Sequence, residues 1–193
     1  MRKGSTITEL DGVWFRRPLV FEQVLRLEMR TSAKMLALVL MLTTIGCDRV
    51  TKHLATTRLA GNSAHTYLNG TIRLEYAENP GAFLSFGENL PDWARTGFLT
   101  VAAALGLAAV AVAAFKLRMR TMPFIGAILF LAGGASNLAD RITRGSVVDF
   151  VNVGVGPLRT GIFNVADVAL MLGVALMILG WDRKYVGAHG NQT

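Results

Sequence analysis

The sequence has little charge and almost no cysteine, and each shortage excludes a class of protein. Only 17% of its 193 residues are charged, against about 25% in soluble domains. A single cysteine, Cys47, can form neither an internal disulfide nor a cysteine-based metal cluster. What the chain has instead is hydrophobic residues, 52% of the total, with a mean hydropathy of +0.41. This composition indicates a membrane protein that is stabilised by packing within the bilayer.

The net charge of +7 could indicate nucleic-acid binding. However, the Lys and Arg residues lie in clusters between apolar runs rather than along one polar face, which is typical of membrane topology. His53, His65 and His189 are scattered, and no spacing of His, Asp and Glu resembles a metal site. We therefore expect no nucleic acid, no metal and no cofactor.

Four segments are apolar enough, or nearly so, to cross a hydrocarbon core, which takes about 20 residues. They are Met35 to Leu54, Phe98 to Phe115, Met122 to Ala139 and Ile162 to Trp181. The second is uncharged, whereas the other three carry polar residues at one end. We predict an all-α membrane protein with four transmembrane helices. Its parts are an N-terminal extension (1–34), a four-helix membrane domain (35–182) and a C-terminal tail (183–193).

Basic residues predict the orientation of these helices. They gather before the first span, between the second and third, and after the fourth. They are Arg2, Lys3, Arg16, Arg17, Arg26, Arg30, Lys34, Lys116, Arg118, Arg120, Arg183 and Lys184. Because basic connections stay in the cytoplasm, both termini are predicted to be cytoplasmic, and the polar ends of the spans then meet at the outer side.

Two longer connections are predicted to lie outside. TIRLEYA, from residue 71, alternates polar and apolar residues and is bounded by NG and NPG, which predicts a small β-element on the outer membrane surface. The second connection suits a short extended segment around Asp149. At the other end of the chain, residues 13–30 mix apolar and basic residues at roughly helical spacing. They are either an interfacial helix or part of a disordered extension, with translation starting at Met29 as a further alternative.

Ionisable residues near a bilayer are costly and are therefore functional candidates. Asp48 and Lys52 are four residues apart and can pair on one helical face, either as part of a site or as an ordinary helix-end ion pair. Asn137 can share a face with Asp140 and Arg141. A final pair of polar residues, Asn164 and Asp167, opens the fourth span.

Asp149 is flanked by Val148 and Phe150, so its surroundings can be partly desolvated. Two carboxylates in such a site repel each other and can hold one proton between them, which supplies an acid and a base together. Ser136 and Ser146 have no histidine nearby in the sequence, so no nucleophile is evident. The same acids could serve a proton-coupled channel or transporter, and a purely structural membrane protein is a third possibility.

Five ordered blocks resemble the lipoprotein signal peptidases, also called signal peptidase II, which are four-span bacterial aspartic proteases. The blocks are DRVTK (48–52), NPGAFLSF (79–86), GGASNLADR (133–141), VVDF (147–150) and FNVAD (163–167). The resemblance implies that Asp149 and Asp167 are the catalytic dyad, and that Asp140 supports Arg141. The residues that it implies around the substrate and the dyad are Asp48, Lys52, Asn79, Gly81, Asn137, Arg141 and Asn164.

The resemblance also implies the substrate and the location. The expected protein is a membrane endopeptidase that cleaves diacylglyceryl-modified prolipoproteins before the lipidated cysteine, with a water activated by the dyad. Its partners would be those lipid-modified prolipoproteins and membrane lipids. We expect a monomer in the bacterial cytoplasmic (inner) membrane, with the active site at the outer face.

Residues 29–47 themselves look like a lipoprotein signal, with a basic start, an apolar run, a small residue and then Cys47. Cleavage there would remove the span that carries Asp48 and Lys52 into position, and three further spans follow. We therefore expect this stretch to be the first transmembrane helix and Cys47 to be a buried packing residue.

Overall fold

The computed structural model describes residues 7–10, 13–16, 19–81, 91–117 and 119–180. Contacts divide the chain into two units, Met1–Val39 and Leu40–Thr193. The first unit contains an antiparallel hairpin of β1 (Ile7–Leu10) and β2 (Val13–Arg16), followed by the beginning of α1 (Leu19–Arg58). In the segment for which we weighed an interfacial helix against a disordered extension, residues 13–16 therefore form a strand and residues 19–30 are helical.

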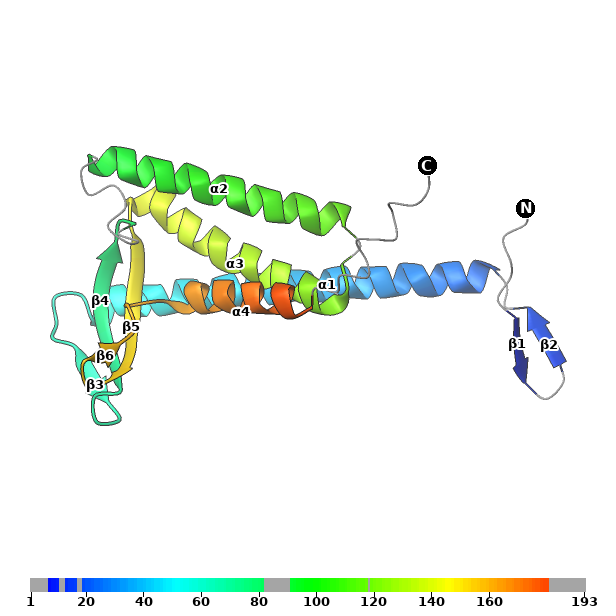
Figure 1. Ribbon diagram of the computed structural model, residues 1–193, viewed down its shortest axis with the longest axis horizontal. Coiled ribbons are helices and arrows are strands. Elements are labelled where there is room, and N and C mark those ends of the chain that lie inside the picture. The colour runs from blue at the N-terminus through cyan, green and yellow to red at the C-terminus, as the bar shows by residue number, and fades with distance from the viewer. Residues whose placement is uncertain (1–6, 11–12, 17–18, 82–90, 118, 181–193) are drawn as a thin grey trace. The chain divides into compact units, whose positions relative to one another are not determined.

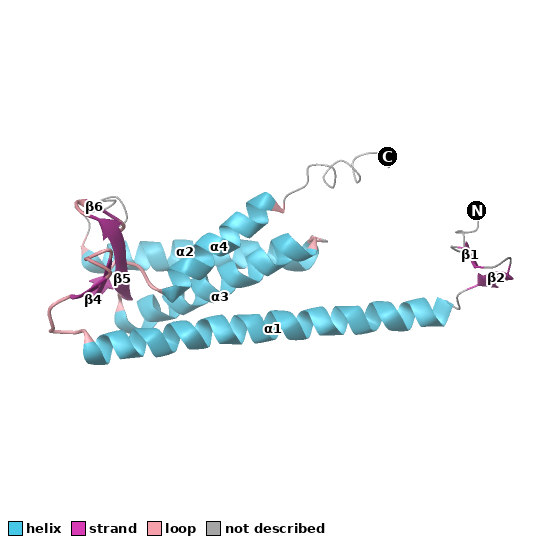
Figure 2. Ribbon diagram, turned by 90° about the horizontal axis from the view of Figure 1, so that it is seen from below, coloured by secondary structure: helices cyan, strands magenta, loops and turns pink. Residues whose placement is uncertain are grey.

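The second unit contains the end of α1 and three further helices, α2 (Asp92–Lys116), α3 (Thr121–Arg144) and α4 (Val165–Leu179). Figures 1 and 2 show α2, α3 and α4 running alongside one another, with a β-sheet across one end. The predicted spans two and three fall within α2 and α3. The fourth was predicted to begin at Ile162, but α4 starts three residues later because Asn164 caps it.

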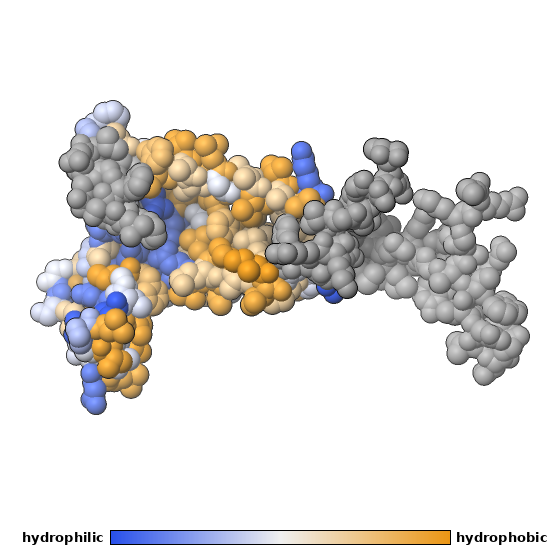
Figure 3. Space-filling view, viewed as in Figure 1, coloured by the Kyte–Doolittle hydropathy of each residue, from blue (hydrophilic) through white to orange (hydrophobic). Residues whose placement is uncertain are grey.

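Two described helical segments are long and apolar enough to cross a membrane, Thr96–Ala114 within α2 and Thr121–Arg144. The helix α4 is apolar but has 15 residues. The expected first span lies in α1, where Asp48, Arg49 and Lys52 add three charges within five residues. Hydrophobic residues cover the visible sides of the helices, and hydrophilic residues gather at the end where the sheet lies (Figure 3).

The sheet is larger than the small β-element that we predicted, so the all-α description is incomplete. It contains β3 (His65–Tyr67), β4 (Ile72–Asn79), β5 (Val147–Val155) and β6 (Leu158–Arg159), paired antiparallel in that order. The two outer connections thus meet, because β4 from the first pairs with β5 from the second. Asn79 pairs with Val147 and Ala77 with Asp149 in this register.

Close packing of α3 on α4 fixes the start of α4 relative to the rest of the unit. A Cβ atom on Gly133 would lie 2.4 Å from the backbone oxygen of Ala166, and one on Gly126 would lie 2.6 Å from that of Gly173. Such contacts are possible only for glycine, which lets the two backbones approach closely. At the sheet, Val148 and Phe150 pack with Ala55 of α1 in a small apolar core.

Candidate active site

Asp167 is held by the first turn of α4. Asn164 is the N-cap: its side-chain oxygen accepts a hydrogen bond from the Asp167 backbone N–H at 2.9 Å. In return, the Asn164 backbone N–H donates to Asp167 Oδ2 at 3.1 Å, which completes a capping box. The carboxylate therefore lies at a helix N-terminus, where the helix dipole favours negative charge.

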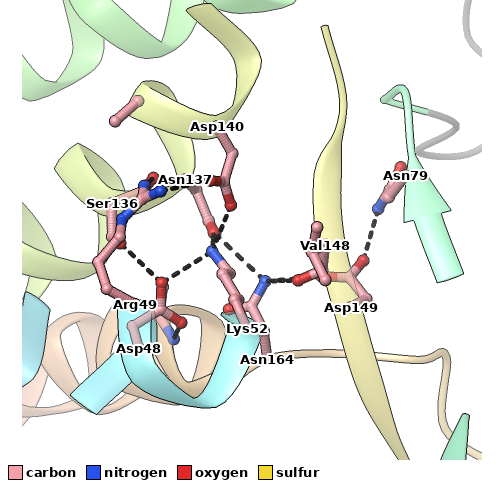
Figure 4. A network of polar contacts seen from close by, with 12 residues as sticks. Asp48, Arg49, Lys52, Asn79, Ser136, Asn137, Asp140, Val148, Asp149 and Asn164 are labelled. Atoms are coloured by element: carbon pink, nitrogen blue, oxygen red, sulfur yellow. Dashed lines mark hydrogen bonds and ion pairs between the residues drawn. The ribbon is translucent and has the colours of Figure 1, made fainter. Parts of the chain in front are cut away.

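Asp149 lies on β5 and is 3% exposed. Its Oδ1 accepts a hydrogen bond from Asn164 Nδ2 at 2.6 Å, and its Oδ2 accepts one from Asn79 Nδ2 at 3.2 Å (Figure 4). Gly81, with φ of 104°, donates its backbone N–H to Asn79 Oδ1 at 2.9 Å. This bond orients the Asn79 amide so that its nitrogen faces Asp149. Asn164 therefore bridges the two acids, through its side chain to Asp149 and its backbone to Asp167.

Burial, and after it the nearby charge of Asp167, raise the pKa of Asp149 from 3.8 to about 6. Hydrogen bonds from Asn79 and Asn164 oppose this shift because they stabilise the ionised carboxylate. The two aspartates thus form an interacting pair in which one proton can be shared, as an acid and base catalyst requires.

A buried ionic cluster lies behind this pair. Lys52 is 3% exposed, and its ammonium contacts Asp48 Oδ2 at 2.8 Å, Asp140 Oδ2 at 2.8 Å and Asn137 Oδ1 at 2.7 Å. Asn137 in turn donates its Nδ2 to Asp167 Oδ1 at 2.8 Å. Lys52 therefore does more than close an ordinary helix-end ion pair, because its contacts reach α3 and, through Asn137, the dyad.

Asp48 links α1 to the start of α4. It is fully buried, and its Oδ1 accepts a hydrogen bond from the Ala166 backbone N–H at 2.8 Å, one residue before Asp167. Its Oδ2 accepts one from Ser136 Oγ at 2.6 Å. Asp48 thus satisfies one of the N–H groups that a helix start leaves unpaired, from another helix. Ser136 and this capping contact were not predicted, because they depend on which helices are neighbours.

Asp140 was expected to support Arg141, but this expectation is wrong. Asp140 accepts from Arg49 Nη1 at 2.6 Å and pairs with Lys52, while Arg49 also donates to the Ser136 backbone oxygen. Arg141 lines a cavity of about 670 Å³ together with Ser146 and with Glu78 and Pro80, which flank Asn79 in the sequence. Arg49 was missed, although a third charge beside Asp48 in an apolar helix was a signal that could have identified it.

Of the residues that the resemblance implied, the structure brings together Asp149 and Asp167 with Asp48, Lys52, Asn79, Gly81, Asn137 and Asn164. Arg141 lines the cavity that Glu78 and Pro80 also line, and its place in the site stays a prediction. Residues 82–86 of the NPGAFLSF block lie outside the described residues. Cys47 was expected to be buried, but it is exposed on α1, one residue before the fully buried Asp48. Among the described residues, no group of three or more His, Cys, Asp or Glu side chains could hold a metal ion.

Comparison with known proteins identifies the family. The sequence profile of signal peptidase (SPase) II matches residues 40–181, which include every residue of the site. The chain belongs to the signal peptidase II family. It is therefore an aspartic peptidase by family, and its paired aspartates are the feature of the site that fits this class.

Curated relatives agree with the profile. A lipoprotein signal peptidase from Hydrogenovibrio crunogenus is 33% identical over 132 residues, which cover 68% of this chain and 76% of that protein. One from Chlorobium phaeovibrioides is 36% identical over 158 residues, covering 76% of this chain and 89% of the relative. The match to the signal peptidase II family thus extends over most of the length of both relatives.

The fold is also similar to that of solved bacterial membrane enzymes. One such structure superposes with a TM-score of 0.66 at 24% identity, covering 74% of this chain and 90% of the other. A second has a TM-score of 0.65 at 22% identity, with 81% and 93% covered. Four helices with a sheet across one end are thus an arrangement that this signal peptidase II family member shares with enzymes known to be membrane proteins.

Proposed function

We propose that this chain is a membrane endopeptidase that removes the signal peptide from diacylglyceryl-modified prolipoproteins by cleaving before the lipidated cysteine. Family membership supports the reaction class. The observation that carries the residue assignment is the pair of aspartates bridged by Asn164, with Asp149 Oδ1 at 2.6 Å from the Asn164 amide and Asp167 Oδ2 at 3.1 Å from its backbone nitrogen.

The chemistry follows from one shared proton. The ionised carboxylate of the dyad takes a proton from a water molecule, and the resulting hydroxide attacks the scissile carbonyl carbon. The protonated carboxyl donates its proton to the carbonyl oxygen. Collapse of the tetrahedral intermediate breaks the C–N bond: the leaving nitrogen takes the proton that the first carboxylate removed from the water, and a hydroxyl of the intermediate returns a proton to the second carboxylate. Asn79 and Asn164 keep the Asp149 carboxylate in one orientation during these steps.

The substrate's lipid is compatible with the architecture. We propose that all four helices cross the bilayer, with both termini cytoplasmic and with the sheet and the dyad at the outer face of the inner membrane. The acyl chains of a lipidated substrate then stay among the lipids while its peptide reaches the dyad. The proposed partners are the prolipoprotein and membrane lipids, and one chain holds all the residues of the site, as a monomeric enzyme requires.

We further propose three parts for the chain. Residues 1–34 form a cytoplasmic extension, residues 35–182 form the peptidase domain and residues 183–193 form a cytoplasmic tail. The profile match over residues 40–181 supports the limits of the central part.

The test uses the purified full-length protein and a synthetic peptide that carries a diacylglyceryl cysteine. The wild-type protein should cut the bond before that cysteine, as read by mass spectrometry. Asp149→Asn and Asp167→Asn should each lower kcat by about 10²- to 10⁴-fold, which is the usual contribution of an acid or base group, while still binding the peptide. The matched control is Glu75→Gln, which neutralises an acid outside the dyad, on the neighbouring strand β4. This variant should cleave normally. Full cleavage by both Asp variants would contradict the assignment.

A further inference from the structure

The buried cluster around Lys52 lies close to the dyad. The Lys52 ammonium group, however, contacts neither Asp149 nor Asp167 directly. Its three N–H groups have three acceptors, one oxygen each of Asp48, Asp140 and Asn137, at 2.7 to 2.8 Å. The first two are negative, and with Arg49 on Asp140 the charges of the cluster balance. The third is a neutral amide, which needs no cation for charge balance.

That third contact fixes the orientation of the Asn137 amide. An ammonium group only donates hydrogen bonds, so the amide oxygen must face Lys52. A second donor, Asn164 Nδ2, lies 3.2 Å from the same oxygen. The amide nitrogen is therefore directed to Asp167 Oδ1, 2.8 Å away. Without Lys52, only the longer contact from Asn164 would hold the amide oxygen, so the amide would be held less firmly with its nitrogen toward Asp167.

The surroundings of the two acids then differ. Asp167 accepts hydrogen bonds from the Asn137 amide, which Lys52 polarises, and from the Asn164 backbone N–H. It lies in the first turn of α4 and is only partly buried. Asp149 is 3% exposed, lies on a strand and accepts hydrogen bonds from two neutral side-chain amides, those of Asn79 and Asn164. Hydrogen bonds from polarised donors, a helix N-terminus and contact with solvent all favour negative charge.

We propose that Lys52 is a positioning residue that, through the Asn137 amide, makes Asp167 the ionised, water-activating member of the dyad and leaves Asp149 to carry the proton. This proposal rests on the proposed peptidase function. The raised pKa of Asp149, about 6, is consistent with the assignment because it keeps a proton on that carboxyl in weakly acidic conditions.

The chain offers a matched pair of variants. Lys52→Met keeps the length of the side chain but removes the donor to Asn137, and Arg49→Met removes the other cation that contacts Asp140 without any bond to Asn137. Both leave Asp140 with one cation. Lys52→Met also removes the cation beside Asp48, which Arg49 does not contact. Asn137→Leu, which keeps both ion pairs of Lys52, is therefore the third variant. A loss of kcat that Lys52→Met and Asn137→Leu share, and that Arg49→Met lacks, reports on the contact between Lys52 and Asn137.

Lys52→Met should lower kcat for the lipidated peptide by about 10- to 100-fold, the usual effect of removing a residue that orients a group in contact with the reacting centre. KM should be nearly unchanged. Lys52→Arg, which still only donates, should restore part of kcat. The acid limb of the pH profile of kcat/KM should move to higher pH by about one unit, since a cation that favours the dyad's negative charge is gone. The other charged groups around Asp167 are Asp149 on β5, Asp48 on α1 and Asp140 on α3, and these stay in place.

Arg49→Met should leave the acid limb of the pH profile of kcat/KM at the wild-type pH. Equal shifts in both methionine variants, or wild-type kcat in Lys52→Met, would overturn the proposal. If Lys52→Met does not accumulate, Asn137→Leu replaces it, because Lys52 then keeps both of its acidic partners; wild-type kcat in that variant would also overturn the proposal. Failure of the proposed function would look different, since the wild-type protein itself would not cleave the peptide.

Discussion

Single amide side chains organise the two aspartates that we propose as the catalytic dyad of this protein. Asn79, Asn137 and Asn164 each have an oxygen that accepts a bond from a donor, so each nitrogen is left facing a carboxylate of the dyad. An amide can do this because it carries a donor and an acceptor on one rigid plane. The spacing of Asn164 before Asp167 was visible in the sequence, but the donors that orient Asn79 and Asn137 come from the structure.

The raised pKa of Asp149 makes a prediction about stability. Between pH 3.8 and about 6 the unfolded chain loses this proton before the folded protein does. The free energy of unfolding therefore falls by about 3 kcal/mol as pH rises through this window. The Asp149→Asn variant has no such pH-dependent fall in the free energy of unfolding, because its side chain does not titrate. It lacks one of the two hydrogen bonds of Asp149 at every pH. The unfolding temperature of the variant, relative to wild type, should rise from pH 4 to pH 8. A difference that stays constant with pH would contradict this.

At the scale of the elements, the dyad depends on where α4 begins. Its start is fixed from three sides: by the Asn164 cap, by the Asp48 carboxylate bonded to the Ala166 N–H, and by α3 at Gly133. The second acid comes from β5, which is placed by its pairing with β4. A helix end and a strand thus supply one acid each, and both elements are held by several contacts.

Gly133→Ala tests this arrangement. The added methyl group would lie 2.4 Å from the backbone oxygen of Ala166, so α4 must move away at the residue before Asp167. We expect a loss of about 1–3 kcal/mol in stability, the usual cost of overpacking, together with a fall in cleavage. The matched control is Gly106→Ala in α2, where nothing lies within 4 Å of the added Cβ. That variant should be as stable as wild type or up to about 1 kcal/mol more stable, as measured by thermal unfolding, and should cleave normally.

At the scale of the whole molecule, the site is built from segments far apart in the sequence. The connections that contain β4 and β5 pair in one sheet, while α1, α3 and α4 supply polar side chains next to it. All of these residues belong to the unit Leu40–Thr193. The hairpin and the first part of α1 belong to the other unit.

A chain that begins at Met29 should therefore retain cleavage. It lacks β1, β2 and the first turns of α1 but keeps every residue of the site. The measurement is processing of a labelled prolipoprotein in cells that depend on this chain, with the same truncation carrying Asp167→Asn as the inactive control. Loss of processing at normal protein levels would show that the N-terminal unit takes part in activity.

The sequence by itself determined the candidate residues for the chemistry and which segments are apolar helices, because hydropathy and short spacings are local properties. Asp48 with Lys52 and Asn164 with Asp167 are such spacings. Only the tertiary structure decided the partners of Asp140, the cavity that Arg141 lines and the exposure of Cys47. These depend on which helix faces pack together, which no local pattern encodes. The pairing of β4 with β5 is likewise a long-range contact, and it is what places Asn79 beside Asp149.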